Sequence, residues 1–179
     1  TASVWNTAKG IECVFVKASS DSSNDNYTLY PKVMVGYTVK TSVTLYSNFV
    51  YNIYIPKANV KSFTINGKAV AYTTEKINNV EYYRVEVNLP APETLNDIKV
   101  KVTLNSGSTT VDANWTLNVL KYSKSVINGS YSDTAKILMK DMLVYATAAH
   151  TYFDNALSNE KTTEINALVG NYNREMPTG

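Results

Sequence analysis

Few residues of this chain are of the types that carry out catalysis, and they lie far apart in the sequence. The 179 residues include one histidine, His150, and one cysteine, Cys13. A serine–histidine triad or a two-histidine zinc site would have to be built on His150 alone, so we expect a packing or surface role for this residue. A single cysteine forms no internal disulfide. Because Cys13 lies in the apolar run Ile11–Val16, we expect a small buried side chain and no reactive thiol.

Carboxylates are the second possible source of chemistry. Glu81 and Glu86 would face opposite sides of one strand, although folding can bring other carboxylates together into a glycosidase-type pair. The segment Asp21–Asp25 has oxygen ligands at alternate positions, as a calcium loop does. Its sixth and twelfth positions hold asparagine and lysine where an EF-hand needs glycine and glutamate. We therefore expect no enzyme, no metal site and no cofactor.

The composition favours an extracellular, β-rich module. Apolar residues make up 44% of the chain and charged residues 18%, and 14 tyrosines accompany abundant Asn, Ser and Thr, a mixture that suits antiparallel sheets. The formal charge of +2 is spread out, which argues against nucleic acid, and no apolar run reaches the 18 residues of a membrane span. Cysteine-poor chains of this kind are typical of secreted proteins of anaerobic Gram-positive bacteria. We expect a monomeric module of a longer, multidomain surface protein, because neither end carries a visible targeting or lipidation signal.

Apolar residues at every second position predict half-buried strands over the first two thirds of the chain. The alternating positions are Val33, Val35, Tyr37 and Val39; Val43, Leu45, Phe49, Tyr51, Ile53 and Ile55; Tyr83, Val85, Val87 and Leu89; Ile98, Val100, Val102 and Leu104; and Val111, Ala113, Trp115, Leu117 and Val119. The dipeptide Asn66-Gly67 predicts a tight hairpin between Val60–Ile65 and Lys68–Tyr72. No helix intervenes between these strands, so residues 1–118 are predicted to form an antiparallel, Ig-like β-sandwich of seven or eight strands.

The hydrophobic period becomes helical at about residue 118. A first helix near Leu120–Asn128 is expected to stop at Gly129, and a third, weaker helix is expected at about Glu160–Tyr172. Between them, Ser132 or Asp133 caps a long helix that continues to about Leu157. Its inner stripe is predicted to be Ala135, Leu138, Met142, Tyr145, Ala149 and Tyr152, widened by Met139, Leu143, Ala146 and Phe153. Residues 119–175 would thus form a helical subdomain, a hairpin or three short helices, packed on the sandwich as one folding unit.

The candidate ligand-binding residues are on strand faces and on the long helix. Tyr46, Tyr54 and Tyr82 are predicted to project from the outer faces of strands, and Arg84 shares the face of Tyr82. Tyrosine suits protein recognition and sugar stacking, although an outward tyrosine is also simply a good β-former.

On the long helix, Ile137 and Val144 lie off the predicted inner stripe and beside Lys140. If the helix is not covered on both faces, these three residues mark a contact for a partner or for another module.

Two stretches of the chain resemble a recurrent module of large secreted or wall-attached proteins of gut Firmicutes. Ser42–Pro56 (SVTLYSNFVYNIYIP) is similar to its strand L-x-S-D-F-x-x-N-x-Y-I-P. Residues 119–153, with the Tyr131-Ser132-Asp133 start, are similar to its helix Y-S-D-x-x-K-x-L-V-K-A-M-L-N-Y-G-A-A-A-Q-x-Y-F. The resemblance covers about a third of the chain directly. The chain departs from it at Val144, Ala146 and His150, where asparagine, glycine and glutamine are usual.

The resemblance implies a binding function and supplies no catalytic residues. Some proteins that look similar are antibody-binding surface proteins of the B-cell superantigen type, which engage the framework of the variable domain. The chain is therefore expected to be an extracellular, non-catalytic module of a bacterial surface protein that engages a host protein such as an immunoglobulin variable domain. A carbohydrate-binding module and a structural spacer in a multidomain surface protein are the alternatives.

Overall fold

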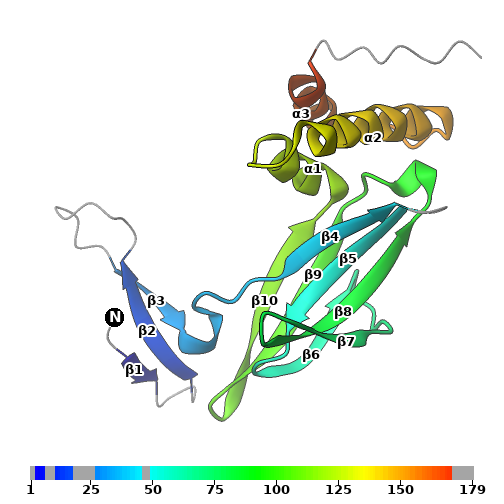
Figure 1. Ribbon diagram of the computed structural model, residues 1–179. Coiled ribbons are helices and arrows are strands. Elements are labelled where there is room, and N and C mark those ends of the chain that lie inside the picture. Colours follow the sequence, from blue (N-terminus) through cyan, green and yellow to red (C-terminus); the bar gives the residue numbers. More distant parts are fainter. Residues whose placement is uncertain (1–2, 7–10, 18–26, 46–48, 171–179) are drawn as a thin grey trace, which may run out of the picture. The chain divides into compact units, whose positions relative to one another are not determined.

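The computed structural model describes residues 3–6, 11–17, 27–45 and 49–170, which form a mainly antiparallel β-fold followed by three C-terminal helices (Figure 1). The N-terminal sheet has the order β1-β2-β3, with β1 (Ser3–Asn6), β2 (Ile11–Lys17) and β3 (Tyr27–Pro31). A four-stranded sheet has the order β4-β5-β8-β7, with β4 (Lys40–Leu45), β5 (Phe49–Pro56), β8 (Val80–Leu89) and β7 (Thr73–Ile77). The third sheet has the order β10-β9-β6, with β10 (Thr109–Leu117), β9 (Ile98–Ser106) and β6 (Val60–Ile65). The helices are α1 (Val119–Ile127), α2 (Asp133–Tyr152) and α3 (Asn159–Val169), and two short 3-10 helices are η1 (Lys32–Met34) and η2 (Ala91–Glu93).

The chain forms two compact units, each built from three segments. The first unit comprises residues 1–40, 53–85 and 99–116, and the second comprises residues 41–52, 86–98 and 117–179. Strand β10 ends at Leu117 and helix α1 begins at Val119, where the change of hydrophobic period predicts this transition. The three helices share the second unit with the segments 41–52 and 86–98. The division into subdomains 1–118 and 119–175 stays a prediction.

The strands that alternate most strictly in sequence also alternate in burial. Along β9, the residues Ile98, Val100, Val102 and Leu104 are buried, and Lys99, Lys101 and Asn105 are exposed. In β10, the buried Ala113 lies between the exposed Asp112 and Asn114. On β2, Cys13 is buried, as the sequence predicts. One face of β9 and one face of β10 therefore lie on the apolar core.

The Asn66-Gly67 turn is confirmed, but only its first strand forms. Asn66 and Gly67 have φ values of 51° and 77°, the left-handed backbone that a type I′ turn requires. Beyond the turn, a single bridge joins Ile65 to Lys68, and residues 69–72 form no strand. The next strand, β7, pairs with β8 across a second left-handed pair, Asn78-Asn79. The prediction of a strand over Lys68–Tyr72 is therefore wrong, because β6 pairs with β9 instead.

Two further strand predictions are corrected by the structure. The segment from Val33 to Val39 forms η1 and a turn, because Gly36 has a φ of 69°, a left-handed conformation that an extended strand does not contain. The segment from Val43 to Ile55 is two strands, β4 and β5, which are neighbours in one sheet. Both segments alternate in hydrophobicity, but alternation alone does not reveal where a chain reverses.

Each helix starts at a polar cap. The side chain of Asn118 accepts a hydrogen bond from the Lys121 N–H at 2.7 Å, and Ser132 caps α2 through the Ala135 N–H at 3.2 Å, as predicted. Ser158 caps α3 in the same way through Lys161. The long helix ends at Tyr152, five residues before the predicted end.

Helix side chains hold the turn that leads into β9. Leu95 is fully buried in that turn, and its N–H donates to Nε2 of His150 at 3.0 Å. Its carbonyl accepts from Nζ of Lys161 at 2.9 Å. The other ring nitrogen of His150, Nδ1, lies 3.0 Å from the Asn155 carbonyl. A neutral ring with its proton on Nδ1 satisfies both contacts, so His150 is a packing residue that links α2 to this turn.

This geometry predicts unequal losses of stability for two substitutions at one position. In His150→Leu, the buried Leu95 N–H loses its acceptor, and we expect the free energy of unfolding to fall by about 2–3 kcal/mol. In His150→Gln, one amide supplies both an acceptor and a donor, so we expect most of the stability to remain. Urea denaturation of the two variants beside the parent protein measures the difference. Equal losses would show that the two hydrogen bonds do not determine stability here.

Candidate functional site

The outer face of α2 is the main candidate for a functional surface. Helices α1 and α3 and the short helix η2 contact α2, and Figure 1 shows α1 and α3 beside it. The residues that point into this contact are Met139, Met142, Leu143, Ala146, Ala149 and His150. The face opposite these residues carries exposed large apolar side chains around Asp141, and the described part of the chain does not cover them.

We call this second apolar face the outer stripe. It consists of Ile137, Leu138, Val144, Tyr145 and Tyr152, with exposed fractions of 45, 47, 47, 68 and 81%. Steps of seven residues, about two turns, relate Ile137 to Val144 and Leu138 to Tyr145, which places them on one side of the helix. Phe153 extends the stripe beyond the helix end, where its ring packs edge-on against Tyr152 at 5.0 Å.

The prediction of the inner stripe is partly wrong. Leu138, Tyr145, Tyr152 and Phe153 were expected to face inward, and they are exposed. The other large part of the predicted stripe is confirmed, because Met139, Met142, Leu143, Ala146 and Ala149 are buried. Small or flexible side chains at several of these positions allow neighbouring helices to approach closely. The predicted stripe combined residues of two apolar faces, since periodicity gave no basis for separating the covered face from the exposed one.

Ile137 and Val144 are exposed, as expected from their place off the predicted inner stripe. Lys140 lies between them in sequence and is partly exposed. The structure therefore brings two of these three residues together in the outer stripe. Their role in binding stays a prediction.

The tyrosines of the strands do not form the outward surface that the sequence suggested. Tyr82 is only 4% exposed, so the expectation that it projects into solvent is wrong. Its ring meets that of the half-buried Tyr54 edge-on, with centroids 6.4 Å apart. Tyr54 lies on β5 and Tyr82 lies on β8, the two inner strands of the four-stranded sheet. Tyr46 lies outside the described residues.

Charged side chains of the same chain contact the rings of Tyr54 and Tyr82. The guanidinium carbon of Arg84 lies 5.8 Å from the Tyr54 ring centroid, and its Nη1 is 3.3 Å from the Glu75 carboxylate. The ammonium of Lys40 lies 5.5 Å from the centroid of Tyr82. These cation–π and ionic contacts stabilise the sheet. Tyr82 has little free surface for a ligand, whereas the Arg84 side chain is 30% exposed and its role in binding stays a prediction.

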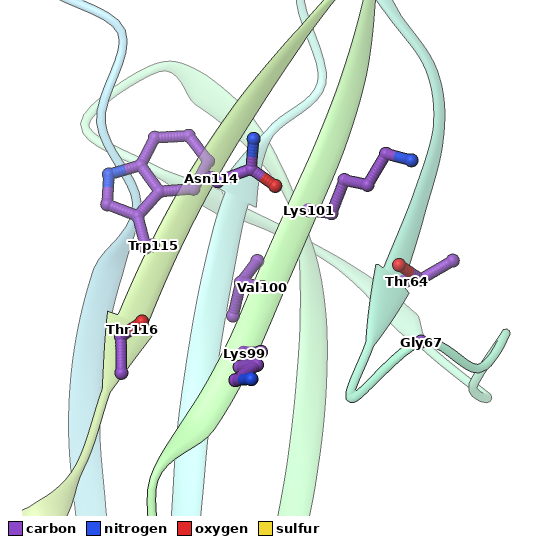
Figure 2. Close-up of a pocket in the computed structure, with 8 residues that line it drawn as sticks. All are labelled: Thr64, Gly67, Lys99, Val100, Lys101, Asn114, Trp115 and Thr116. Carbon is purple, nitrogen blue, oxygen red and sulfur yellow. The ribbon is translucent and has the colours of Figure 1, made fainter.

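A shallow depression of about 260 Å³ lies on the sheet β10-β9-β6 (Figure 2). Its lining consists of Thr64, Gly67, Lys99, Val100, Lys101, Asn114, Trp115 and Thr116. Beside it, Asp112 accepts from the Thr103 hydroxyl at 2.7 Å and pairs with Lys101 at 3.7 Å. The lining contains no carboxylate, histidine or cysteine, so this depression offers no acid, base or nucleophile apart from lysine and threonine. Its polar groups are those expected of a solvent-facing side of a sheet.

The described residues contain no group of three or more His, Cys, Asp and Glu side chains that could hold a metal ion. No helix in this part of the chain combines the length and the apolar character needed to cross a membrane. Comparisons of the chain with protein families, with curated proteins and with solved structures found no match.

The Asp97 carboxyl lies in an ionic network of the second unit and has a lowered pKa. Oδ1 of Asp97 accepts from the Asn118 amide at 2.9 Å and lies 3.0 Å from Nζ of Lys161. The hydrogen bond from Asn118 is the largest cause that lowers the pKa of Asp97 below its ordinary value of 3.8. Burial, the second largest cause, raises this pKa, and the contact with Lys161 lowers it further. The carboxylate is about half exposed, and it ties the turn before β9 to α1 and α3.

The lowered pKa of Asp97 predicts a loss of stability in acid. The folded state holds this proton less tightly than the unfolded state, so the contribution is complete above about pH 4 and is lost as the pH falls through the folded pKa. We expect Asp97→Asn to lower the free energy of unfolding by about 1 kcal/mol at neutral pH, and the difference from the parent to shrink in acid. Urea denaturation from about pH 7 to about pH 3 measures it, with the exposed Glu93→Gln as control. A difference that does not change with pH would contradict this role.

Proposed function

We propose that this chain is an extracellular, non-catalytic binding module of a bacterial surface protein and that it engages a host protein through the outer stripe of α2. The observation that carries the proposal is the exposure of Ile137, Leu138, Val144, Tyr145 and Tyr152 on a helix whose other face is already packed. Single exposed apolar residues are normal on protein surfaces, but a contiguous row marks an interaction site.

The dimensions and composition of the outer stripe suit a protein partner. From Ile137 to Tyr152 the helix rises about 22 Å, close to the span of one side of a compact interface. Tyr145 and Tyr152 offer large, amphipathic rings of the type enriched at interface centres. A helix with such a face is recognised as a set of anchors spaced by three, four and seven residues.

The resemblance to antibody-binding surface proteins of gut Firmicutes selects the partner. We propose an immunoglobulin variable domain, bound at its framework and independently of the antigen site. Those proteins look similar to this chain over residues 119–153, the stretch that contains α2. The same stretch therefore carries both the resemblance and the exposed apolar face.

A structural spacer is the competing function. A spacer has no reason to expose large apolar side chains, and its tyrosines would pack internally. Tyr51 and Tyr82 are buried in this way, but Tyr145 and Tyr152 are more than two thirds exposed. These two residues favour a binding module over a spacer.

We also propose that the four-stranded sheet and the sheet β10-β9-β6 pack face to face as an Ig-like sandwich. Ile53, Ile55 and Val85 are buried on the first sheet, and Val100 and Val102 are buried on the second. Two sheets that each carry an apolar face are stable when those faces cover each other.

The experiment is retention of antibody fragments on the immobilised domain. We expect a subset of human Fab fragments to be retained whatever their antigen. The double variant Val144→Gln, Tyr145→Gln keeps good helix formers and removes two central anchors, so we expect it to weaken retention at least about tenfold. Surface plasmon resonance on pooled and single Fab fragments measures the effect.

Thr163→Ala, an exposed change on α3, is the matched control and should leave retention unchanged. Circular dichroism and thermal unfolding verify that the double variant is folded. If the parent domain retains no Fab fragment, the immunoglobulin partner is wrong. If the double variant binds as well as the parent, the outer stripe is not the binding surface.

A further inference from the structure

A second aromatic surface lies in the first unit and is independent of α2. Phe63 on β6, Tyr83 on β8 and Tyr72, which follows the Asn66-Gly67 turn, form a cluster of three rings. Their centroids are 5.5 Å apart for Phe63 and Tyr72, 5.4 Å for Phe63 and Tyr83, and 4.9 Å for Tyr72 and Tyr83. Tyr72 meets both other rings edge-on, at 64° and 75°. The cluster thus holds each ring in a fixed orientation.

The cluster forms one wall of an open depression of about 240 Å³. The other lining residues are Val60, Lys61, Ser62, Ala69 and Val70. Tyr72 is 55% exposed although two rings contact it, so part of its surface is open to a ligand. Pockets for drug-sized ligands have volumes of about 300–1,000 Å³, so this depression suits a group the size of one ring.

The polar groups around the depression distinguish among ring-sized ligands. Lys61 and Ser62, both exposed, are the polar residues of its lining. The nearby Lys57 is 5.4 Å from the Tyr83 centroid and pairs with Glu81 at 3.5 Å, so its charge is partly offset. Lys61 therefore supplies the positive charge of the lining itself. A proline-rich peptide needs a groove between aromatic walls, whereas these three rings contact one another in a single cluster.

We propose that this depression binds one pyranose ring that carries a carboxylate, as a unit of an acidic glycan. The C–H face of the sugar packs on Tyr72 and Tyr83, its hydroxyls contact Ser62, and its carboxylate pairs with Lys61. The proposal stands on different residues from those that would bind an immunoglobulin, and either can fail without the other.

The test is binding of small, monovalent sugars to the whole chain at physiological ionic strength. Titration calorimetry measures trigalacturonate and sialyllactose as acidic probes, maltotriose as a neutral sugar and triglutamate as an acidic probe without a sugar ring. We expect at least one of the acidic sugars to bind. Maltotriose should bind more weakly, and triglutamate should not bind. No binding of either acidic sugar at about 5 mM, or equal binding of triglutamate, overturns the proposal.

Variants locate the site. We expect Tyr72→Ala to weaken acidic-sugar binding about threefold to tenfold, and Tyr72→Phe to retain it, because the ring face makes the contact. Lys61→Gln should lower affinity for the acidic sugars to that for maltotriose. Tyr145→Gln on α2 is the matched control: it should leave sugar binding unchanged, as Tyr72→Ala should leave Fab retention unchanged. Unaltered sugar binding by a folded Tyr72→Ala variant, or binding of a proline-rich peptide in place of the sugars, overturns the assignment.

Discussion

The second unit depends on a short stretch of buried backbone that no helix or strand pairs. Leu95 is fully buried in the turn between η2 and β9, so its N–H and carbonyl must find partners elsewhere. His150 of α2 accepts from the N–H, and Lys161 of α3 donates to the carbonyl. Asn155 adds a third contact to the same segment through the Pro92 carbonyl. Because these partners lie on or between two helices, the buried turn determines which sides of α2 and α3 face inward.

The orientation of α2 has a consequence for its other face. With His150 pointing inward, the side chains half a turn away point to solvent, and in this helix they include Val144, Tyr145 and Tyr152. Exposing such residues contributes nothing to the stability of the unit, since their area stays in water. The internal packing of α2 is already completed by residues such as Met139 and Ala146. The partner contact that we propose would give the second apolar face an advantage that the packing of the described residues does not.

Most local features of the fold could be predicted from the sequence, but the covered faces could not. Alternation predicted the buried side of β9, and the Asn66-Gly67 dipeptide predicted its left-handed turn. The same alternation placed Tyr82 outward, because an aromatic residue among polar ones suits either a solvated face or a packed one. The role of His150 depends on Leu95, which is 55 residues away in the chain. Periodicity reports which side chains share a face, whereas burial depends on partners that only the tertiary structure brings near.

The exposed tyrosines differ in how firmly the chain holds them, and this difference bears on what each can recognise. Tyr145 extends into solvent from a helix, where a large ring can adjust its rotamer to a broad partner surface. Tyr72 is held edge-on by Phe63 and Tyr83, so its orientation is fixed before any ligand arrives. Fixing a ring in advance reduces the entropy lost on binding, which matters most for a small ligand with few contacts. An adaptable face on α2 and a rigid cluster of rings beside β6 therefore suit ligands of different size, a protein surface and a single sugar ring.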